Sequence, residues 1–168
     1  INKVDLALAA GNVAGAGTAA VAGGTNALIF QSTVESNLGG NVEAGENINV
    51  HSMADSLLVN VAGAVAGSGT ASVTPVAIVT YFKGSSEAFL TENSVLNATG
   101  NVSVKGESKE TITTDAIGAT GSGTAAVSGT VAVTVSTQET RAKAKKNVSI
   151  TANAIDMTAF DKAQFVGV

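Results

Sequence analysis

The sequence predicts an all-β protein, a right-handed parallel β-helix (β-solenoid) built from repeats of about 54 residues. Three observations lead to this fold class. A pentapeptide, GSGTA, recurs along the chain, and the stretch after each copy alternates apolar with small or hydroxylic residues. Only 4% of the residues are aromatic although 45% are hydrophobic, so we expect a thin interior made mainly of Val, Ala and Ile.

The glycine-rich pentapeptide marks the repeats. GSGTA begins at Gly67 and at Gly121, and a near copy, GAGTA, begins at Gly15. No helical pattern and no Lys-Ser/Thr pair follow it, which disfavours a phosphate loop. We therefore interpret its glycines as turn and close-packing residues, namely Gly15, Gly17, Gly67, Gly69, Gly121 and Gly123.

A second block sets the repeat length. GENINV, TGNVSV and KKNVSI place Asn47, Asn101 and Asn147 in equivalent positions, at spacings of 54 and 46 residues. This alignment predicts that the last copy has lost about eight residues, and such length changes belong in loops. We divide the chain, a single solenoid segment, into repeats 1–56, 57–111 and 112–168, the last one shortened.

Period-two alternation predicts strands on both sides of each bend. After the pentapeptide, residues 21–29, 73–81 and 127–135 place apolar side chains on one face and small or hydroxylic side chains on the other. β-branched residues are enriched there, as is typical of strands. Residues 57–66, before the bend, predict a strand of very small side chains, and shorter strands are expected at 102–104 and 148–150.

A repeat of this size cannot build its own core, so we expect the repeats to stack with strands about 4.8 Å apart. A coil of such a solenoid typically takes roughly 20 or more residues, so each repeat is expected to hold two or three coils. Asparagines at the turns can bond the backbone and the equivalent asparagine of the next coil. The alternative is antiparallel, with GSGT turns closing β-hairpin repeats or a sandwich.

Composition and charge exclude several classes of partner. The net charge is −4, and the only local group of cations is Arg141, Lys143, Lys145 and Lys146, so we expect no nucleic-acid partner. Polar residues interrupt every apolar stretch well short of the roughly 20 residues that span a bilayer, so we expect no membrane insertion by this segment. The absence of cysteine excludes disulfides and zinc ribbons.

The repeat units resemble a known style of bacterial repeat. An Ala/Gly/Val tract, a GxGTA-like centre, a Val/Thr strand and a segment such as SSEAFLTENSVLNATGNVSV (residues 85–104) are similar to repeats of large Gram-negative filamentous adhesins, leukotoxin-type exoproteins and autotransporter passenger domains, especially of fusobacteria. The resemblance covers essentially the whole chain and carries over no functional residue. It implies export across the outer membrane, a β-helical passenger and a role in adhesion or virulence. Because the sequence has no initiator Met and no processing signal at Ile1, we expect it to be an excerpt of a longer polypeptide.

The residues that could carry chemistry do not form a recognisable site. His51, Ser52 and Asp55 suggest a nucleophilic site, but neighbours along a strand point to opposite faces. Their expected equivalents in the next repeat also lack this chemistry: Lys105, Gly106 and Lys109. The pairs Glu43/Glu46 and Glu107/Glu110 match no calcium loop and are expected on solvated faces. We predict no catalytic, cofactor-binding or metal-ligating residue, and no enzyme.

The sequence thus predicts a structural repeat segment of a secreted or surface-anchored bacterial adhesin or exoprotein. It would extend the passenger and display loops for adhesion to host cells or between bacteria. Its expected partners are the neighbouring coils of the same long polypeptide and a host or bacterial surface receptor. The alternatives are a self-assembling extracellular fibre subunit, whose copies associate end to end, and a β-helix carbohydrate-active enzyme.

Overall fold

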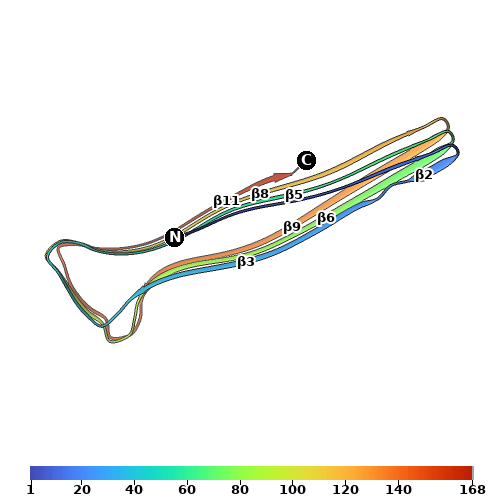
Figure 1. Ribbon diagram of the computed structural model, residues 1–168. Helices are drawn as coiled ribbons and strands as arrows, with labels where there is room; N and C mark the ends of the chain where they lie inside the picture. The colour runs from blue at the N-terminus through green and yellow to red at the C-terminus, as the bar shows by residue number, and fades with distance from the viewer. Residues whose placement is uncertain (168) are drawn as a thin grey trace.

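Parallel pairing between successive repeats organises the molecule. The structure is a computed structural model that describes residues 1–167. Every strand pair over these residues is parallel, and the turns stack into a solenoid (Figure 1). The predicted all-β solenoid is therefore confirmed, and the antiparallel hairpin alternative is wrong.

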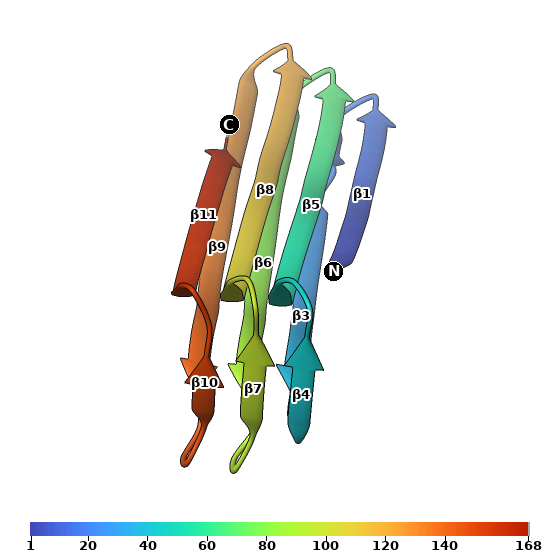
Figure 2. The ribbon, with the colours of Figure 1, turned by 90° about the vertical axis from the view of Figure 1, so that its left-hand side faces the viewer.

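Three parallel sheets form the walls of the solenoid. Sheet A contains β1 (Asn2–Ala16), β5 (Ile48–Ser68), β8 (Val102–Ser122) and β11 (Ile155–Gly167). Sheet B contains β2 (Ala19–Val21), β3 (Gly24–Leu38), β6 (Ala71–Leu90) and β9 (Ala125–Ala144). The short sheet C contains β4 (Asn41–Ala44), β7 (Val95–Ala98) and β10 (Ser149–Thr151). In each turn the chain runs along sheet A, bends, returns along sheet B and crosses sheet C (Figure 2).

One repeat makes one turn. Leu6 pairs with Leu58 across β1 and β5, and Leu58 pairs with Ile112 across β5 and β8. Equivalent residues of neighbouring turns are therefore a whole repeat apart, and the expectation of two or three coils per repeat is wrong. The reason is strand length. β5 has 21 residues and β6 has 20, whereas strands commonly have about 5–6, so two long strands use most of the repeat.

The coil is right-handed, as predicted. In Figure 1 the chain travels from left to right along the upper sheet A and returns along the lower sheet B. Figure 2 shows the molecule from the left-hand side of Figure 1, with β1 on the right and β11 on the left. The right of Figure 2 is the side nearer to the viewer of Figure 1, so successive turns recede from that viewer. A clockwise path that recedes from the viewer is a right-handed screw.

The third repeat has not lost about eight residues, and it is only one residue shorter than the second, because Ile155 pairs with Val102 whereas Val102 pairs with Ile48. Phe89 pairs with Lys143 and Val95 pairs with Ser149, so the full repeat length is kept on both sides of the loop between sheets B and C. Asn147 therefore lies above Asn93, whose side-chain oxygen accepts a 3.1 Å hydrogen bond from Asn147 Nδ2. The alignment of Asn147 with Asn101 is wrong, because NVSI leads into sheet C whereas NVSV leads into sheet A.

The hydroxylic face of sheet B, rather than its apolar face, lines the interior. In β6 the buried positions include Ser72, Thr74, Val76, Ile78 and Thr80, while the valines between them are directed outward. The predicted interior of Val, Ala and Ile is therefore incomplete. It also contains large side chains, among them Phe82, Leu58, Leu90 and Leu96, together with buried hydroxyls.

Core side chains are larger at mid-strand than near the bend. Near the bend the buried cluster is rich in alanine, including Ala62, Ala64 and Ala66. At mid-strand the cluster consists of Leu28, Leu58, Phe82 and Ile112. Sheets A and B approach closely near the bend, where a Cβ on Gly24 would lie 2.8 Å from the Gly63 carbonyl oxygen. Small side chains are required where the sheets are close, and larger ones fill the interior at mid-strand.

Polar side chains inside the solenoid bond across from one sheet to the other. Asn60 Nδ2 donates to Thr80 Oγ1 at 2.8 Å, and the hydroxyls of Thr114 and Thr134 lie 3.0 Å apart. Because buried polar groups are costly unless they are hydrogen-bonded, the pairing explains why hydroxyls are tolerated in this interior. These cross-sheet bonds also fix how sheet A and sheet B are aligned.

The pentapeptide forms the bend between sheets A and B, as predicted. Its backbone follows the same path in each turn, because Thr70 N donates to Thr18 O and Thr124 N donates to Thr70 O. A Cβ on Gly69 would collide with the Gly17 carbonyl of the previous turn, whereas a Cβ on Gly67 would meet nothing within 4 Å. The second glycine of GSGTA is therefore required by close stacking, and the first is not.

We expect Gly69→Ala to destabilise the protein by about 1–3 kcal/mol, because the added methyl group forces two stacked turns apart. Gly67→Ala, in the same pentapeptide, is the matched control and should leave the free energy of unfolding within about 0.5 kcal/mol. Urea unfolding followed by circular dichroism measures both. Equal effects of the two substitutions would contradict the stacking role of Gly69.

Candidate functional surfaces

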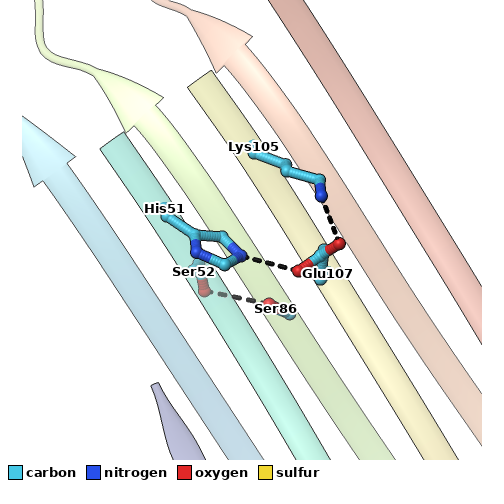
Figure 3. Close-up of polar contacts among 5 residues, drawn as sticks. All are labelled: His51, Ser52, Ser86, Lys105 and Glu107. Atoms are coloured by element: carbon cyan, nitrogen blue, oxygen red, sulfur yellow. Dashed lines mark hydrogen bonds and ion pairs between the residues drawn. The ribbon is translucent and has the colours of Figure 1, made fainter. Parts of the chain in front are cut away.

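His51, Ser52 and Asp55 do not converge. Ser52 is fully buried, and its hydroxyl lies 2.9 Å from the Ser86 hydroxyl inside the solenoid (Figure 3). His51 is directed at Glu107 on the outer face of sheet A. The hydroxyl and the imidazole are on opposite faces of one strand, which confirms the geometric reason for rejecting a nucleophilic site at these residues.

An ionic cluster lies on the outer face of sheet A. Glu107 accepts from His51 Nε2 at 2.8 Å and pairs with Lys105 Nζ at 2.5 Å. Hydrogen bonds from Lys105 and then from His51 lower the pKa of the Glu107 carboxyl below its ordinary value. Beside it is a small hollow of about 120 Å³, lined by Met53, Glu107, Ser108, Lys109, Phe160 and Lys162. The His51–Glu107 contact cross-links neighbouring turns.

Glu110 lies inside the solenoid, so its assignment to a solvated face is wrong. Its exposed fraction is 1%, and Ser136 Oγ donates to its Oε1 at 2.6 Å. Among the described residues its Oε2 has no hydrogen-bond partner. Burial raises the pKa of the Glu110 carboxyl. Odd and even positions of β8 face opposite sides, so Glu107 and Glu110 cannot act as a pair.

A groove lies across the carboxyl ends of the sheet C strands. It has a volume of about 490 Å³ and is lined by Glu43, Ala44, Gly45, Asn97, Ala98, Thr99 and Thr151. Glu43 pairs in register with Asn97, so equivalent positions of successive turns place different polar groups in the groove. Glu43 and Glu46 are exposed, as predicted. The 54-residue spacing of Glu43, Asn97 and Thr151 is a signal that could have identified this groove from the sequence.

The asparagines predicted as structural marks do bond between turns. Asn101 N donates to the Asn47 side-chain oxygen at 2.7 Å, although both residues are exposed rather than directed inward. Asn93 and Asn147 have positive φ angles of 58° and 57°, which asparagine tolerates better than most residues. The repeat alignment does not identify Asn93 as a structural position, because it aligns Asn147 with Asn101 instead of with Asn93.

The cations of the third turn are paired within the solenoid. Lys143 forms an ion pair with Glu87, and Arg141 forms one with Glu139. Lys145 Nζ lies 4.1 Å from the centroid of the Phe89 ring, in cation–π geometry. Lys143 and Lys145 therefore contribute to contacts between turns, whereas the ion pair of Arg141 lies within β9.

Charge is distributed unevenly along each turn. We call residues 6–30, 58–82 and 112–136 the arm, which consists of the bend and the adjoining parts of sheets A and B. The arm contains a single charged residue, Asp115, and all other charged residues belong to the remainder of the turn. Sheet C and its loops therefore form the polar end of the solenoid, opposite the bend.

Comparisons with known proteins give no match: no protein family, no curated protein and no solved structure is significantly similar to the chain. The resemblance to adhesin repeats therefore stays a prediction. Among residues 1–167 there is no helix with the length and apolar character needed to cross a membrane. Within the same residues, no group of three or more His, Cys, Asp or Glu side chains is placed to hold a metal ion.

Replacing Glu110 by Gln tests the buried carboxyl. Its pKa in the folded protein lies above that in the unfolded chain, so in the interval between the two values only the folded protein retains the proton. The free energy of unfolding therefore falls as the pH rises through that interval. Glu110→Gln should remove this loss and add about 1–3 kcal/mol at pH 8, measured by urea unfolding between pH 4 and 8.

Glu107→Gln is the control in the same strand. The lowered pKa of Glu107 means that its stabilising contribution is present above its unfolded pKa and is lost as the pH falls through its folded pKa. Removing it should flatten the acid side of the pH profile and should not stabilise the protein at pH 8. A Glu110→Gln protein with the wild-type profile would contradict a buried, neutral carboxyl.

Proposed function

We propose that this chain is a structural repeat segment of a secreted or surface-anchored bacterial adhesin or exoprotein. In this role the stacked turns form a scaffold, and the polar end at sheet C displays the loops that contact a host cell or another bacterium. The observation that carries the proposal is the contrast between a nearly uncharged arm and a polar end whose side chains differ from turn to turn.

The scaffold role is supported by the pairing of the turns. Strands of 20 and 21 residues pair in register with the next turn over their whole length, so most of the backbone is protected by hydrogen bonds. Protection of this kind resists proteolysis, which acts on locally opened segments. A repeat that only stacks on its neighbours can be added many times without a new core.

The dimensions of a turn limit how far each repeat extends the scaffold. Strand spacing is about 4.8 Å, so one whole repeat adds only about 5 Å of length. A strand of 21 residues spans roughly 70 Å, so each turn is far wider than it is tall. The segment thus builds a broad wall, and reach from a cell surface requires many tandem repeats. This geometry favours display along the sheet C edge over simple extension.

The groove along sheet C is the surface we assign to receptor contact. Glu43, Asn97 and Thr151 present a carboxylate, an amide and a hydroxyl along the stacked strands β4, β7 and β10. Such groups can bond the polar groups of a glycan or of a protein surface. Loop lengths also differ here, since two residues connect β3 to β4 whereas four connect β6 to β7. Variation in loops beside a constant scaffold is typical of recognition surfaces.

A cell-binding assay tests this proposal. Beads coated with the chain should bind to epithelial or bacterial cells more than uncoated beads do, and soluble chain should compete. The triple variant Glu43→Ala, Asn97→Ala, Thr151→Ala should reduce bound beads at least tenfold, because it removes the polar groups of the groove.

The control variant carries the same kinds of substitution on the outer face of β3: Gln31→Ala, Thr33→Ala and Glu35→Ala. It should bind as the wild type does. Binding of wild-type beads no better than uncoated beads, to every cell type tested, would refute the adhesive role, and equal losses in both variants would refute the assignment to sheet C.

A further inference from the structure

The outer face of sheet B carries an apolar surface within the arm. In turn order its outward residues are Val21, Gly23, Thr25, Ala27 and Ile29, then Val73, Pro75, Ala77, Val79 and Tyr81, then Val127, Gly129, Val131, Val133 and Val135. Only Thr25 and Tyr81 among them carry a polar side-chain atom. Val21 is 69% exposed, Val131 60% and Val79 47%, so large apolar side chains face solvent.

This surface is contiguous. Val73 pairs with Val21 on one side and with Val127 on the other, and Tyr81 likewise lies between Ile29 and Val135. Nine residues per strand at about 3.3 Å, over three strands about 4.8 Å apart, cover about 400 Å² of sheet. This area is within the range of the largest apolar patch on a typical monomer, about 300–600 Å², and such patches are often functional.

We propose that this face, which we call the arm face, binds the arm face of a second copy of the chain. The face carries no charged residue, so a charged partner would lose hydration there without gaining a counter-charge. A flat array of β-branched side chains in ladders matches another such array, as in face-to-face sheet packing about 10 Å apart. Every turn presents outward residues that are mostly apolar, so the two faces would pack apolar surface against apolar surface.

Charge sets the relative orientation of the two copies. Arg141, Lys143 and Glu87 lie on the same outer face of sheet B, beyond the arm and toward sheet C. A parallel overlap, in which the strands of both copies run the same way, would bury the charged residues of both copies in the interface. An antiparallel overlap, related by a two-fold axis near Ala77, keeps the uncharged arms together and leaves the polar ends at opposite ends of the dimer.

The area of the arm face determines how tightly two copies are expected to associate. A stable interface typically buries about 800 Å² on each partner, and the arm face offers about half of that over three turns. Association of this chain should therefore be weak and concentration-dependent. Because each further turn would add an equal strip of apolar surface, arrays with more turns would associate side by side more tightly. This lateral contact differs from end-to-end stacking, which would use the strand edges.

Sedimentation velocity over about 10 µM to 1 mM tests the proposal. The wild-type chain should shift from monomer to dimer across this range. Val79→Lys places a charge in the arm face and should weaken dimerisation at least tenfold, and Val133→Lys, also exposed, should do the same. Val65→Lys is the matched control: Val65 is 47% exposed, as is Val79, but it lies on the outer face of sheet A. It should leave dimerisation unchanged.

Cross-linking tests the two-fold arrangement. The chain has no cysteine, so Ala77→Cys introduces a single thiol near the proposed axis. A short thiol-specific cross-linker should then join two chains, whereas Val61→Cys, on the outer face of sheet A, should dimerise as the wild type does but should not be cross-linked. Circular dichroism verifies that each variant is folded.

Three outcomes would overturn the proposal. A wild-type chain that stays monomeric at 1 mM excludes the dimer, and equal weakening by Val65→Lys and Val79→Lys excludes the arm face as its site. Binding of a monomeric wild-type chain to neutral phosphatidylcholine vesicles, lost in Val79→Lys, would assign the face to a lipid surface instead. The adhesion assay is independent of all three, because it probes sheet C.

Discussion

The rest of the structure depends on in-register hydrogen bonding between parallel strands of successive turns. The backbone of each turn is the partner of the next, so all turns must follow one path. At the bend this is seen directly, where Thr124 bonds Thr70 and Thr70 bonds Thr18. A residue that widens one turn displaces its neighbours, which is why Gly69 has no room for a side chain while Gly67 does. Repetition in the sequence is therefore a consequence of repetition in the backbone.

Stacking also explains the unusual placement of apolar and hydroxylic residues in sheet B. Hydroxyls lie inside, where partners such as Thr80 and Asn60 reach each other across a narrow interior. Valines lie outside, where β-branched side chains pack against the equivalent valines of the turns above and below. The pairing is incomplete at the buried carboxyl of Glu110, where only one of the two oxygens has a hydrogen-bond partner among the described residues.

The two ends of each turn have different chemical characters, and our two proposals follow this division. The polar end at sheet C carries the groove and the loops whose lengths vary, and it suits recognition of a receptor. The arm is nearly uncharged, with an apolar face that suits contact with another copy. In a chain with many turns, both surfaces would extend along the whole stack of turns. The adhesive contact at sheet C and the lateral contact at the arm face use different residues, so they would not compete.

The sequence by itself determined the strand class, the repeat length and the position of the bend, because period-two alternation and the recurring GSGTA are local patterns. It also separated His51 from Ser52, since adjacent strand residues face opposite sides. Only the tertiary structure decided that one repeat is one turn, that Asn147 lies above Asn93, and that Glu110 is buried. Alternation indicates that the two faces of a strand differ, but it does not indicate which face is buried. A short motif such as NVSI does not indicate which sheet it belongs to. Those choices depend on pairing between residues about 54 positions apart, which no local pattern encodes.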